Sequence, residues 1–397
     1  MSLLRDLWWS GVDAVVGRAA VANSLRAQPC PVTDVVAVGK AASAMCLGAF
    51  DALSHPCRAL VVTKAGHIDA ELAALAEVQL IEAGHPIPDA NSLVAGDAIR
   101  ERVREADQLL LLVSGGASAL AELLVDGVEL DDLMMMTDQL LAQGADIVQI
   151  NAQRTKQSLI KGGLLLQEFA GRQVTVLAIS DVPDDAIEVI GSGIGATHRV
   201  QQSHSQIAAF SRIIASNHLA RRAIEERAQQ KGIEVRSNSA ALHAPMPDLV
   251  MQLVDQLVAG PPGLYIWGGE PTLELPSAPG VGGRNQSLAL ALWAELGSRR
   301  LAQRARHEQS SATASVAHGV TFDLLVGGTD GTDGPTEAAG GELTLDDGVT
   351  SEQVSAASLA VERADAGSHL AAGGNLLVSG PTGTNVMDIA LCLKHSF

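Results

Sequence analysis

Short apolar runs alternate with helix-length amphipathic segments in the first half of this chain, and that alternation constrains the fold more than any other feature. Each run is a few residues long, rich in Val, Leu or Ile, and bounded by Gly, Ser or Pro, as buried strands are. Strands that alternate with helices form a parallel sheet covered on both faces. The expected strands are Val35–Val38, Ala59–Thr63, Val78–Ile81, Leu109–Val113 and Val174–Ile179, and the expected helices are Ala41–Leu53, Asn91–Glu105, Asp131–Gln143 and Ile147–Leu159.

The sequence changes character at about Ser237, which predicts a second domain. Its expected strands are Leu264–Trp267, Thr272–Leu275, Thr321–Val326, Glu342–Leu345 and Leu376–Val378. Its expected helices are Asn285–Leu296 and Ser351–Val361, the second with capping-box spacing at Thr350 and Gln353. The polar stretch Arg299–Ala317 is expected to be a surface loop or the tail of a helix. We predict one domain over residues 1–236 and another over 237–397, and leave open a return of the C-terminal strand to the first domain.

The charge of the chain limits its partners. The 397 residues include 27 Lys+Arg against 45 Asp+Glu, a formal net charge of -18. An acidic surface repels a phosphate backbone, so nucleic acid is not an expected partner. The four cysteines lack metal-ligand spacing and no apolar run is long enough to span a bilayer, so we expect buried thiols, a cytoplasmic protein and no membrane partner. An anionic substrate would need a local cationic pocket.

Lys40 is the first candidate for such a pocket. It follows Gly39 at the end of an expected strand and opens an expected helix. A lysine there opposes the positive end of the helix dipole, at a cost of a few tenths to about 1 kcal/mol. A bound anion would reverse that balance, whereas screening by water is the alternative. The segment lacks the GxxxxGK[ST] pattern of a Walker A loop.

Two later loops also follow strands of the first sheet. Glycines and hydroxyls can present donors to an anion, although a tight strand-to-helix turn also needs glycine. Asp181 ends its strand, where a carboxylate can hold Mg²⁺ or accept a hydroxyl proton; turn capping is the interpretation we prefer for Asp184 and Asp185. The earlier loop comprises Ser114, Gly115, Gly116, Ala117 and Ser118.

Two cations lie between these loops. Arg154 and Lys161 are seven residues apart, which places them on one face of a helix if the helix continues through both. Lys161 precedes Gly162 and Gly163, a pattern typical of a helix C-terminus, so structure alone accounts for Lys161.

Arg284 is the main candidate in the second domain. It follows a glycine-rich loop ending at Gly283 and opens a helix against its dipole. A planar guanidinium there suits bidentate binding of carboxylate or phosphate, and in so acidic a chain we favour that role over a solvated loop arginine. The loop Gly327–Thr336 could bind a metal or nucleotide phosphates or could be a pair of Asp-Gly turns. Trp267–Thr272 and Ser379–Asn385 are two more Gly-rich loops, each weak evidence alone.

Together these segments resemble the class II glycerate kinase family, whose C-terminal part is called the MOFRL domain. The matching motifs run in one order through nearly the whole chain. They are VGKA at Val38–Ala41, EAGHPIPD at Glu82–Asp89, SGGASAL at Ser114–Leu120, KGG at Lys161–Gly163, SDV at Ser180–Val182, GGE at Gly268–Glu270, GRNQ at Gly283–Gln286, GTDGTDGPT at Gly328–Thr336 and GPTGTNVMD at Gly380–Asp388.

The resemblance implies two Rossmann-like α/β domains with the active site in the cleft between them. It implies phosphorylation of D-glycerate by ATP, with Mg²⁺ or another divalent cation, to give 2-phosphoglycerate. Lys40 and Arg284 would bind the substrate or the transferring phosphoryl group, and Asp181 would be catalytic. A homodimer is the commonest assembly for such an enzyme. The other expected substrate- or nucleotide-binding residues are Gly39, Ser114, Gly115, Gly116, Ala117, Ser118, Gly269, Glu270, Gly283, Asn285, Asp330 and Thr382, with Asp181 and Glu270 as metal ligands.

Two positions depart from the family pattern, and two other functions stay open. Asp184 stands where the family usually has Gly, and Ile194-Gly195 stands where it has Pro-Thr. Members have also been labelled hydroxypyruvate reductases, but the GxGxxG turn expected for NAD(P)H is missing after Gly39 and after Ser114. A non-catalytic protein that binds a sugar acid or nucleotide is the second alternative, because of the departures.

Overall fold

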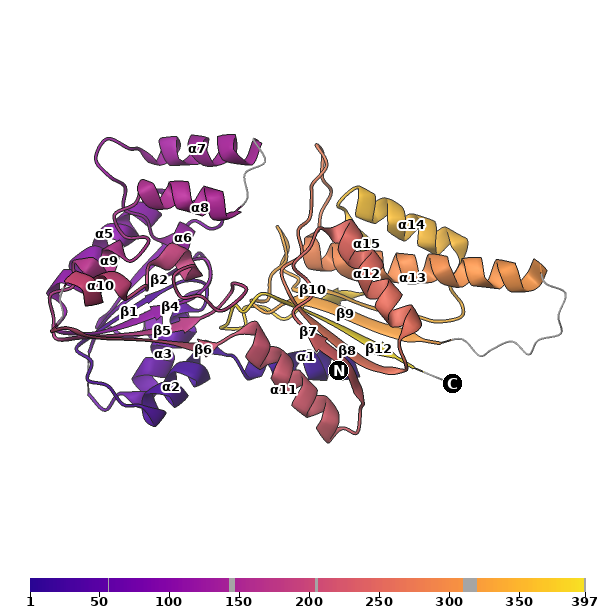
Figure 1. Ribbon diagram of the computed structural model, residues 1–397, viewed down its shortest axis with the longest axis horizontal. Coiled ribbons are helices and arrows are strands. Elements are labelled where there is room, and N and C mark those ends of the chain that lie inside the picture. The colour runs from indigo at the N-terminus through magenta and orange to yellow at the C-terminus, as the bar shows by residue number, and fades with distance from the viewer. Residues whose placement is uncertain (56, 143–146, 204–205, 310–319, 396–397) are drawn as a thin grey trace. The chain divides into compact units, whose positions relative to one another are not determined.

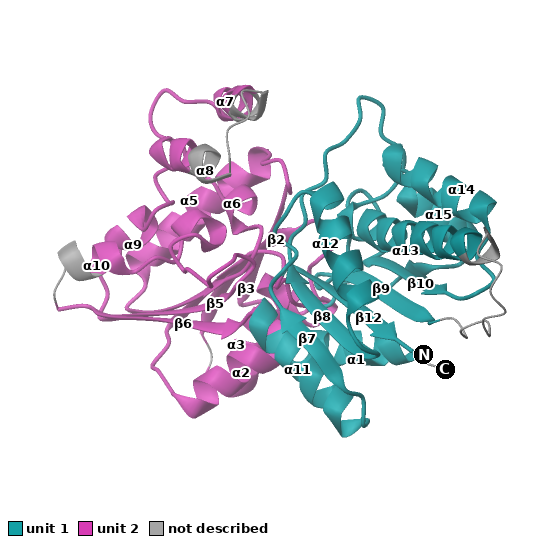
Figure 2. Cartoon of the chain, turned by 45° about the vertical axis from the view of Figure 1, so that its right-hand side comes forward, with its two compact units in different colours: residues 1–14, 217–382, 387–397 teal, residues 15–216, 383–386 magenta. Residues whose placement is uncertain are grey.

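The computed structural model describes residues 1–55, 57–142, 147–203, 206–309 and 320–395 (Figure 1). The chain forms two compact units (Figure 2). Unit 2 comprises residues 15–216 and 383–386, and unit 1 comprises residues 1–14, 217–382 and 387–397. Apart from the short segments, the boundary between the units lies after Ser216, whereas the sequence predicted a boundary at residue 236. The reason is that α11 (Asn217–Gln230) packs on the sheet of unit 1, as does α1 (Leu3–Asp13) from the start of the chain.

The sheet of unit 2 is parallel, as the sequence predicted, with strand order β3-β2-β1-β4-β5-β6. The order reverses at β1, which has β2 on one side and β4 on the other, so the carboxyl ends of β1 and β4 flank a topological switch point. All five expected strands are present, and β6 is added at one edge. The strands are β1 (Asp34–Val38), β2 (Arg58–Lys64), β3 (Val78–Ala83), β4 (Gln108–Val113), β5 (Gln173–Ile179) and β6 (Ala208–Ala215).

Helices cover both faces of this sheet. Figure 1 shows α2 (Gly17–Ala27) and α3 (Ala42–Ala52) on one face and α5 (Ala90–Glu105) on the other. Side chains of alternate residues of β1 lie on opposite faces of the sheet. Val36 and Val38 therefore pack in the same apolar core as Ile99 of α5. The expected helices correspond to α3, α5, α7 and α8, although residue 143 lies outside the described part. The remaining elements are α4 (Ala70–Ala73), α6 (Ala117–Leu120), α7 (Leu130–Ala142), α8 (Ile147–Lys156), α9 (Leu164–Gln167), the 3₁₀ turn η1 (Ile190–Gly193) and α10 (His198–Ser203).

The sheet of unit 1 is mixed, with order β11-β10-β9-β12-β8-β7. Only the β7–β8 pair is parallel, so this α/β unit differs from a parallel Rossmann sheet. The C-terminal strand β12 lies between β8 and β9 and does not return to unit 2. Thr272–Leu275 is not a strand: Thr272 makes one bridge to Pro245, and prolines stand on both sides of the segment. The strands are β7 (Val235–Ser239), β8 (Gly263–Gly269), β9 (Phe322–Gly328), β10 (Gly340–Leu345), β11 (Leu376–Leu377) and β12 (Asp388–Lys394).

In unit 1, α1 and α11 cover one face of the sheet, and α12 (Met246–Ala259), α13 (Arg284–Gln309), α14 (Ser351–Glu362) and α15 (Ala366–Ala372) lie on the other (Figure 1). Residues 299–309 of the expected polar loop are therefore helical, and residues 310–317 of it lie outside the described part. The expected capping box of α14 is confirmed, since Thr350 and Gln353 exchange hydrogen bonds at 3.3 and 3.0 Å.

The four cysteines differ in burial, and only two of them are buried as expected. The cysteines are all free thiols; Cys46 and Cys392 are buried, and Cys30 and Cys57 are partly exposed. Among the described residues, no helix combines the length and the apolar character that a bilayer-spanning segment requires.

Candidate active site

Two loops lie together at the carboxyl ends of β1 and β4 in unit 2. Lys40 N donates to Gly115 O at 2.9 Å, and Ser114 N donates to Val38 O at 3.0 Å. Ser114 Oγ accepts from Ala41 N at 3.1 Å, next to the first residue of α3. Gly39 has φ +126°, and a Cβ there would lie 2.2 Å from Ser114 Oγ. Glycine is therefore required for the loop that holds Lys40 to approach the loop that begins at Ser114.

Asp181 joins these loops from the end of β5. A Cβ on Gly115 would lie 2.0 Å from Asp181 Oδ2, so the bare backbone of Gly115 is packed against the carboxylate. Asn385, from the short segment 383–386, donates from Nδ2 to the same Oδ2 at 3.5 Å. The structure thus brings Lys40, Asp181 and the Ser114 loop together, and it adds Asn385. The sequence prediction did not assign a role to Asn385, although it lies in the GPTGTNVMD motif.

His85 is a second residue that the sequence prediction left without a role. It follows β3, and a Cβ on Gly116 would lie 3.0 Å from His85 Cδ2 and 3.2 Å from Lys40 Cγ. The imidazole and the lysine side chain therefore converge on Gly116. A signal was available in the sequence, because His85 comes four residues after the end of the expected strand Val78–Ile81, at the same edge of the sheet as Lys40.

Alanine substitutions at the two glycines should separate activity from stability. A methyl group on Gly115 meets the ends of the Asp181 and Asn385 side chains, which can move aside, so we expect Gly115→Ala to lower kcat by about tenfold or more through displacement of Asp181, with little loss of stability. A methyl group on Gly39 meets the Ser114 backbone at a positive φ, so Gly39→Ala should lower the urea midpoint. Parallel kinetic and urea measurements check this, and equal stability losses would contradict it.

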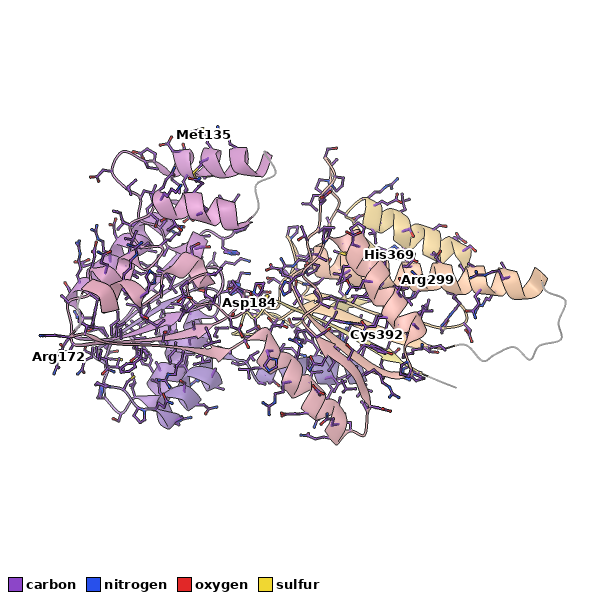
Figure 3. The ribbon with its side chains drawn as sticks, in the orientation of Figure 1. Met135, Arg172, Asp184, Arg299, His369 and Cys392 are labelled. Carbon is purple, nitrogen blue, oxygen red and sulfur yellow. The ribbon has the colours of Figure 1, made fainter. Side chains whose placement is uncertain are left out.

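The two positions that depart from the family pattern, 184 and 194, each have a local structural explanation. Asp184, labelled in Figure 3, has φ 58°, and Asp185 has φ 52°. These are left-handed conformations that glycine favours and aspartate tolerates better than most residues, so the backbone shape typical of glycine persists without the glycine. Ile194 is 1% exposed and belongs to the apolar core of unit 2. The substitution at 194 therefore contributes to packing.

Arg284 lies in unit 1 between two carboxylates. Its Nε donates to Asp388 Oδ2 at 2.6 Å, and its Nη1 pairs with Glu270. Burial alone would lower the pKa of Arg284, but Asp388 and Glu270 more than offset this and raise it. Burial raises the pKa of Asp388, which Arg284 opposes. Asp388 and Glu270, which was predicted to be a metal ligand, thus balance the charge of the guanidinium.

Asp333 occupies the start of α13 beside Arg284. Its carboxylate accepts hydrogen bonds from Asn285 N at 3.1 Å and Gln286 N at 2.8 Å. Burial raises the pKa of Asp333 to about 7, although these backbone hydrogen bonds oppose the shift. Gly283 is in close contact, since a Cβ there would lie 2.3 Å from Asp333 Cγ. Asp333 therefore accepts hydrogen bonds from two backbone N–H groups at the N-terminus of α13, which have no partner within the helix.

The remaining predicted residues of unit 1 connect its loops. Asp330 Oδ1 accepts from Thr332 N at 3.0 Å, which is an Asp-Gly turn, and Thr382 Oγ1 donates to Thr329 O at 2.5 Å. Asn285 Nδ2 donates to Asp388 Oδ1 at 2.9 Å. Gly269 has φ +132°, and a Cβ there would lie 2.7 Å from His243 Nε2. The predicted site residues thus form two sets, Gly39, Lys40, Ser114–Ser118 and Asp181 in unit 2, and Gly269, Glu270, Gly283–Asn285, Asp330 and Thr382 in unit 1.

A parallel sheet in this strand order, with glycine-lined loops, a lysine and a carboxylate at its carboxyl edge, defines an α/β protein built to handle a small anionic ligand. Residues 3–229 match the family described as a domain of unknown function, DUF4147, and residues 263–388 match the MOFRL family. The chain belongs to the glycerate 2-kinase family with a MOFRL domain, which confirms the resemblance found in the sequence.

Three curated proteins and one crystal structure illustrate the similarity. Glycerate 2-kinase of Pyrococcus horikoshii is 32% identical, over 91% of this chain and 87% of that protein. D-glycerate 2-kinase of Thermotoga maritima is 31% identical, over 96% of this chain and 95% of that protein. The crystal structure of glycerate kinase from Thermotoga maritima superimposes with a TM-score of 0.78 at 29% identity and covers 98% of this chain and 97% of that one. A putative hydroxypyruvate reductase of Agrobacterium vitis is 28% identical, over 98% of this chain and 94% of that protein.

Proposed function

We propose that this chain is an ATP-dependent glycerate 2-kinase, which phosphorylates D-glycerate at the 2-hydroxyl to give 2-phosphoglycerate and ADP. The observation that carries the proposal is the convergence of Lys40, Asp181 and the glycine-lined Ser114 loop at the carboxyl edge of the parallel sheet. The names of the relatives support it, since those from Pyrococcus horikoshii and Thermotoga maritima are glycerate 2-kinases.

The side chains of unit 2 supply the parts that phosphoryl transfer needs. Asp181 orients the 2-hydroxyl and accepts its proton as the bond from this oxygen to the γ-phosphorus forms and the bond from that phosphorus to ADP breaks. Lys40 balances negative charge on the transferring group, and the backbone of Gly115 and Gly116 leaves room for phosphate oxygens to approach. Positioning and electrostatics supply most of the rate.

Arg284 of unit 1 is proposed to bind an acidic group of the substrate. A guanidinium can donate to more than two acceptors, so a carboxylate or phosphate can be added to its contacts with Asp388 and Glu270. Glu270 is the exposed member of the pair and the one that can move aside. Asp388 is 2% exposed and fixes the guanidinium.

A divalent cation is proposed to be bound mainly by the phosphates of the nucleotide. Within the described residues no group of three His, Cys, Asp or Glu is placed to hold a metal ion. A single carboxylate, Asp181, fits Mg²⁺, which typically takes one or two carboxylates together with substrate phosphates. When bound, Mg²⁺ would neutralise charge on the β- and γ-phosphates.

An assay of ADP formation tests the proposal. The purified protein with ATP, MgCl₂ and D-glycerate is expected to release ADP only when D-glycerate is present, and phosphorus NMR should identify 2-phosphoglycerate and not the 3-isomer. A parallel reaction with NADH and hydroxypyruvate tests the reductase, for which neither β1 nor β4 is followed by a GxGxxG turn. Oxidation of NADH without ADP formation would replace the proposal, and thermal stabilisation by D-glycerate without turnover would indicate a binding protein.

The assembly and location are also proposed. A cytoplasmic homodimer is favoured, since two-fold dimers are the commonest oligomers and free thiols are typical of reducing compartments. Light scattering during gel filtration measures the mass, and a monomer at micromolar concentration would contradict the dimer.

A further inference from the structure

Two buried charges in unit 2 form a closed pair. Lys161 is 1% exposed and Glu122 is 0% exposed, and Lys161 Nζ pairs with Glu122 Oε2. The other oxygen of Glu122 accepts from Ser158 Oγ at 2.6 Å and from Leu123 N at 3.1 Å. The charge of Glu122 is therefore balanced by Lys161, and both of its oxygens have donors. The sequence pattern was typical of a helix C-terminus at Lys161. In the structure α8 already ends at Lys156, so Lys161 is not the last residue of that helix.

Arg154 is a second cation beside this pair. Its Nη2 donates to Ser118 O at 3.2 Å, but its Nε is buried and has no hydrogen-bond partner. Burial lowers the pKa of Arg154, and Glu122 opposes that shift. The group thus holds two cations and one anion in a poorly solvated place, where a buried N–H without an acceptor is costly.

The hydrogen bond from Arg154 to Ser118 O also gives the location of Arg154. Ser118 belongs to the loop in which Gly115 lies against Asp181 and Gly116 lies against Lys40 and His85. The loop that carries Ser192 packs on α6, where a Cβ on Gly191 would lie 2.9 Å from Ala117 Cβ. Ser192 Oγ is likewise buried without a partner. Two unpartnered donors therefore flank the helix that follows the glycine-lined loop.

We propose that Arg154 binds an oxyanion of the substrates at the Ser114–Ser118 loop, as a further cation of the site in unit 2. The oxyanion is the carboxylate of D-glycerate or a phosphate group of ATP, and the inference rests on the proposed function. The bond to Ser118 fixes the guanidinium plane and leaves other N–H groups for the ligand. A purely structural tie between α8 and α6 would explain that bond but neither the unpartnered Nε nor the excess positive charge.

Calorimetric titrations of four proteins test this assignment. Wild type, Arg154→Gln, Arg154→Lys and Lys156→Gln are titrated separately with D-glycerate, with ATP and with inorganic phosphate. Lys156 is the matched control, since it lies on the same helix, is exposed and donates to the side chain of Gln153 at 3.2 Å. We expect Arg154→Gln to weaken binding about 10- to 100-fold for either the carboxylate or the phosphate ligands. Lys156→Gln should stay within about twofold of wild type, because an exposed charge is screened.

The lysine variant separates a guanidinium contact from a simple charge effect. Arg154→Lys keeps the charge and loses the planar guanidinium, so we expect it to bind the ligand about five to ten times more weakly than wild type. Steady-state kinetics of the same variants should show a raised KM for the ligand that the titrations identify. Unchanged affinity of Arg154→Gln for all three ligands would overturn the assignment, and if that variant does not fold, unchanged affinity of Arg154→Lys would do so. A wild type that binds these ligands but forms no ADP would refute the kinase and leave the role of Arg154 decided by the titrations.

Discussion

Asp181→Asn is expected to lower kcat for glycerate phosphorylation by about 10²- to 10⁴-fold, the range that a positioned acid or base contributes. The change removes the charge and the proton acceptor but keeps the size of the side chain that lies against Gly115. Asp181 has Asn385 beside it, at 3.5 Å, and lies two residues after the end of β5, so the fold gives this carboxylate a fixed position at the sheet edge. Initial rates of ADP release at saturating D-glycerate and ATP measure the effect.

Asp184→Asn is the matched control for this experiment. It makes the same chemical change three residues away, at an exposed position in a left-handed conformation that asparagine adopts readily. We expect its kcat to remain within about twofold of wild type, because a screened surface charge has little effect on the reaction. Full activity of Asp181→Asn, with D-glycerate saturating, would remove Asp181 from the chemistry. Equal losses in both variants would point to a general effect of charge on the loop.

The grouping of the candidate residues in unit 2 was largely predictable because it is encoded locally. Lys40, Ser114 and Asp181 each follow an apolar run that is readily identified as a buried strand. In a parallel sheet the carboxyl ends of the strands share one edge, so residues that directly follow the strands are brought together without further information. Periodicity and glycine placement were sufficient for this step.

Pairings between distant segments were not encoded in that way. Asn385 reaches Asp181 across 204 residues, and β12 takes a central place in the sheet of unit 1 although it comes last in the chain. The edge strand β6 was overlooked because polar and exposed residues interrupt its apolar pattern, as at Ser211 and Arg212. The local periodicity of a strand does not indicate which other strand it will pair with.

Arg284 shows how a correct choice of residue can rest on an incomplete reason. The sequence argument selected it as a cation placed against a helix dipole, in need of a ligand. The structure supplies Asp388, 104 residues away, as a hydrogen-bonded partner, and Asp333 as the acceptor at the helix start. The dipole argument considers only the helix itself. The carboxylates that contact Arg284 and the start of the helix come from distant parts of the chain, the start of β12 and the loop that carries Asp333.

Lys161→Met is expected to lower the free energy of unfolding by about 3–5 kcal/mol, the usual cost of leaving one member of a buried ion pair unpaired. Glu122 is 0% exposed and would lose the cation that is paired with it, because among the described residues only Lys161 forms an ion pair with this carboxylate. Burial lowers the pKa of Lys161 to about 8, although Glu122 opposes the shift, which indicates how little water reaches the pair. Urea unfolding followed by circular dichroism measures the change.

The double variant Lys161→Met with Glu122→Gln distinguishes the pair from either residue alone. It removes both charges and leaves an amide oxygen to accept from Ser158, so much of the lost stability should return. Arg222→Met is the surface control, because the Arg222–Glu226 pair is 65% and 55% exposed and its loss should shift the urea midpoint far less. If Lys161→Met were as stable as wild type, the buried ion pair would contribute no measurable stability and the prediction would be wrong.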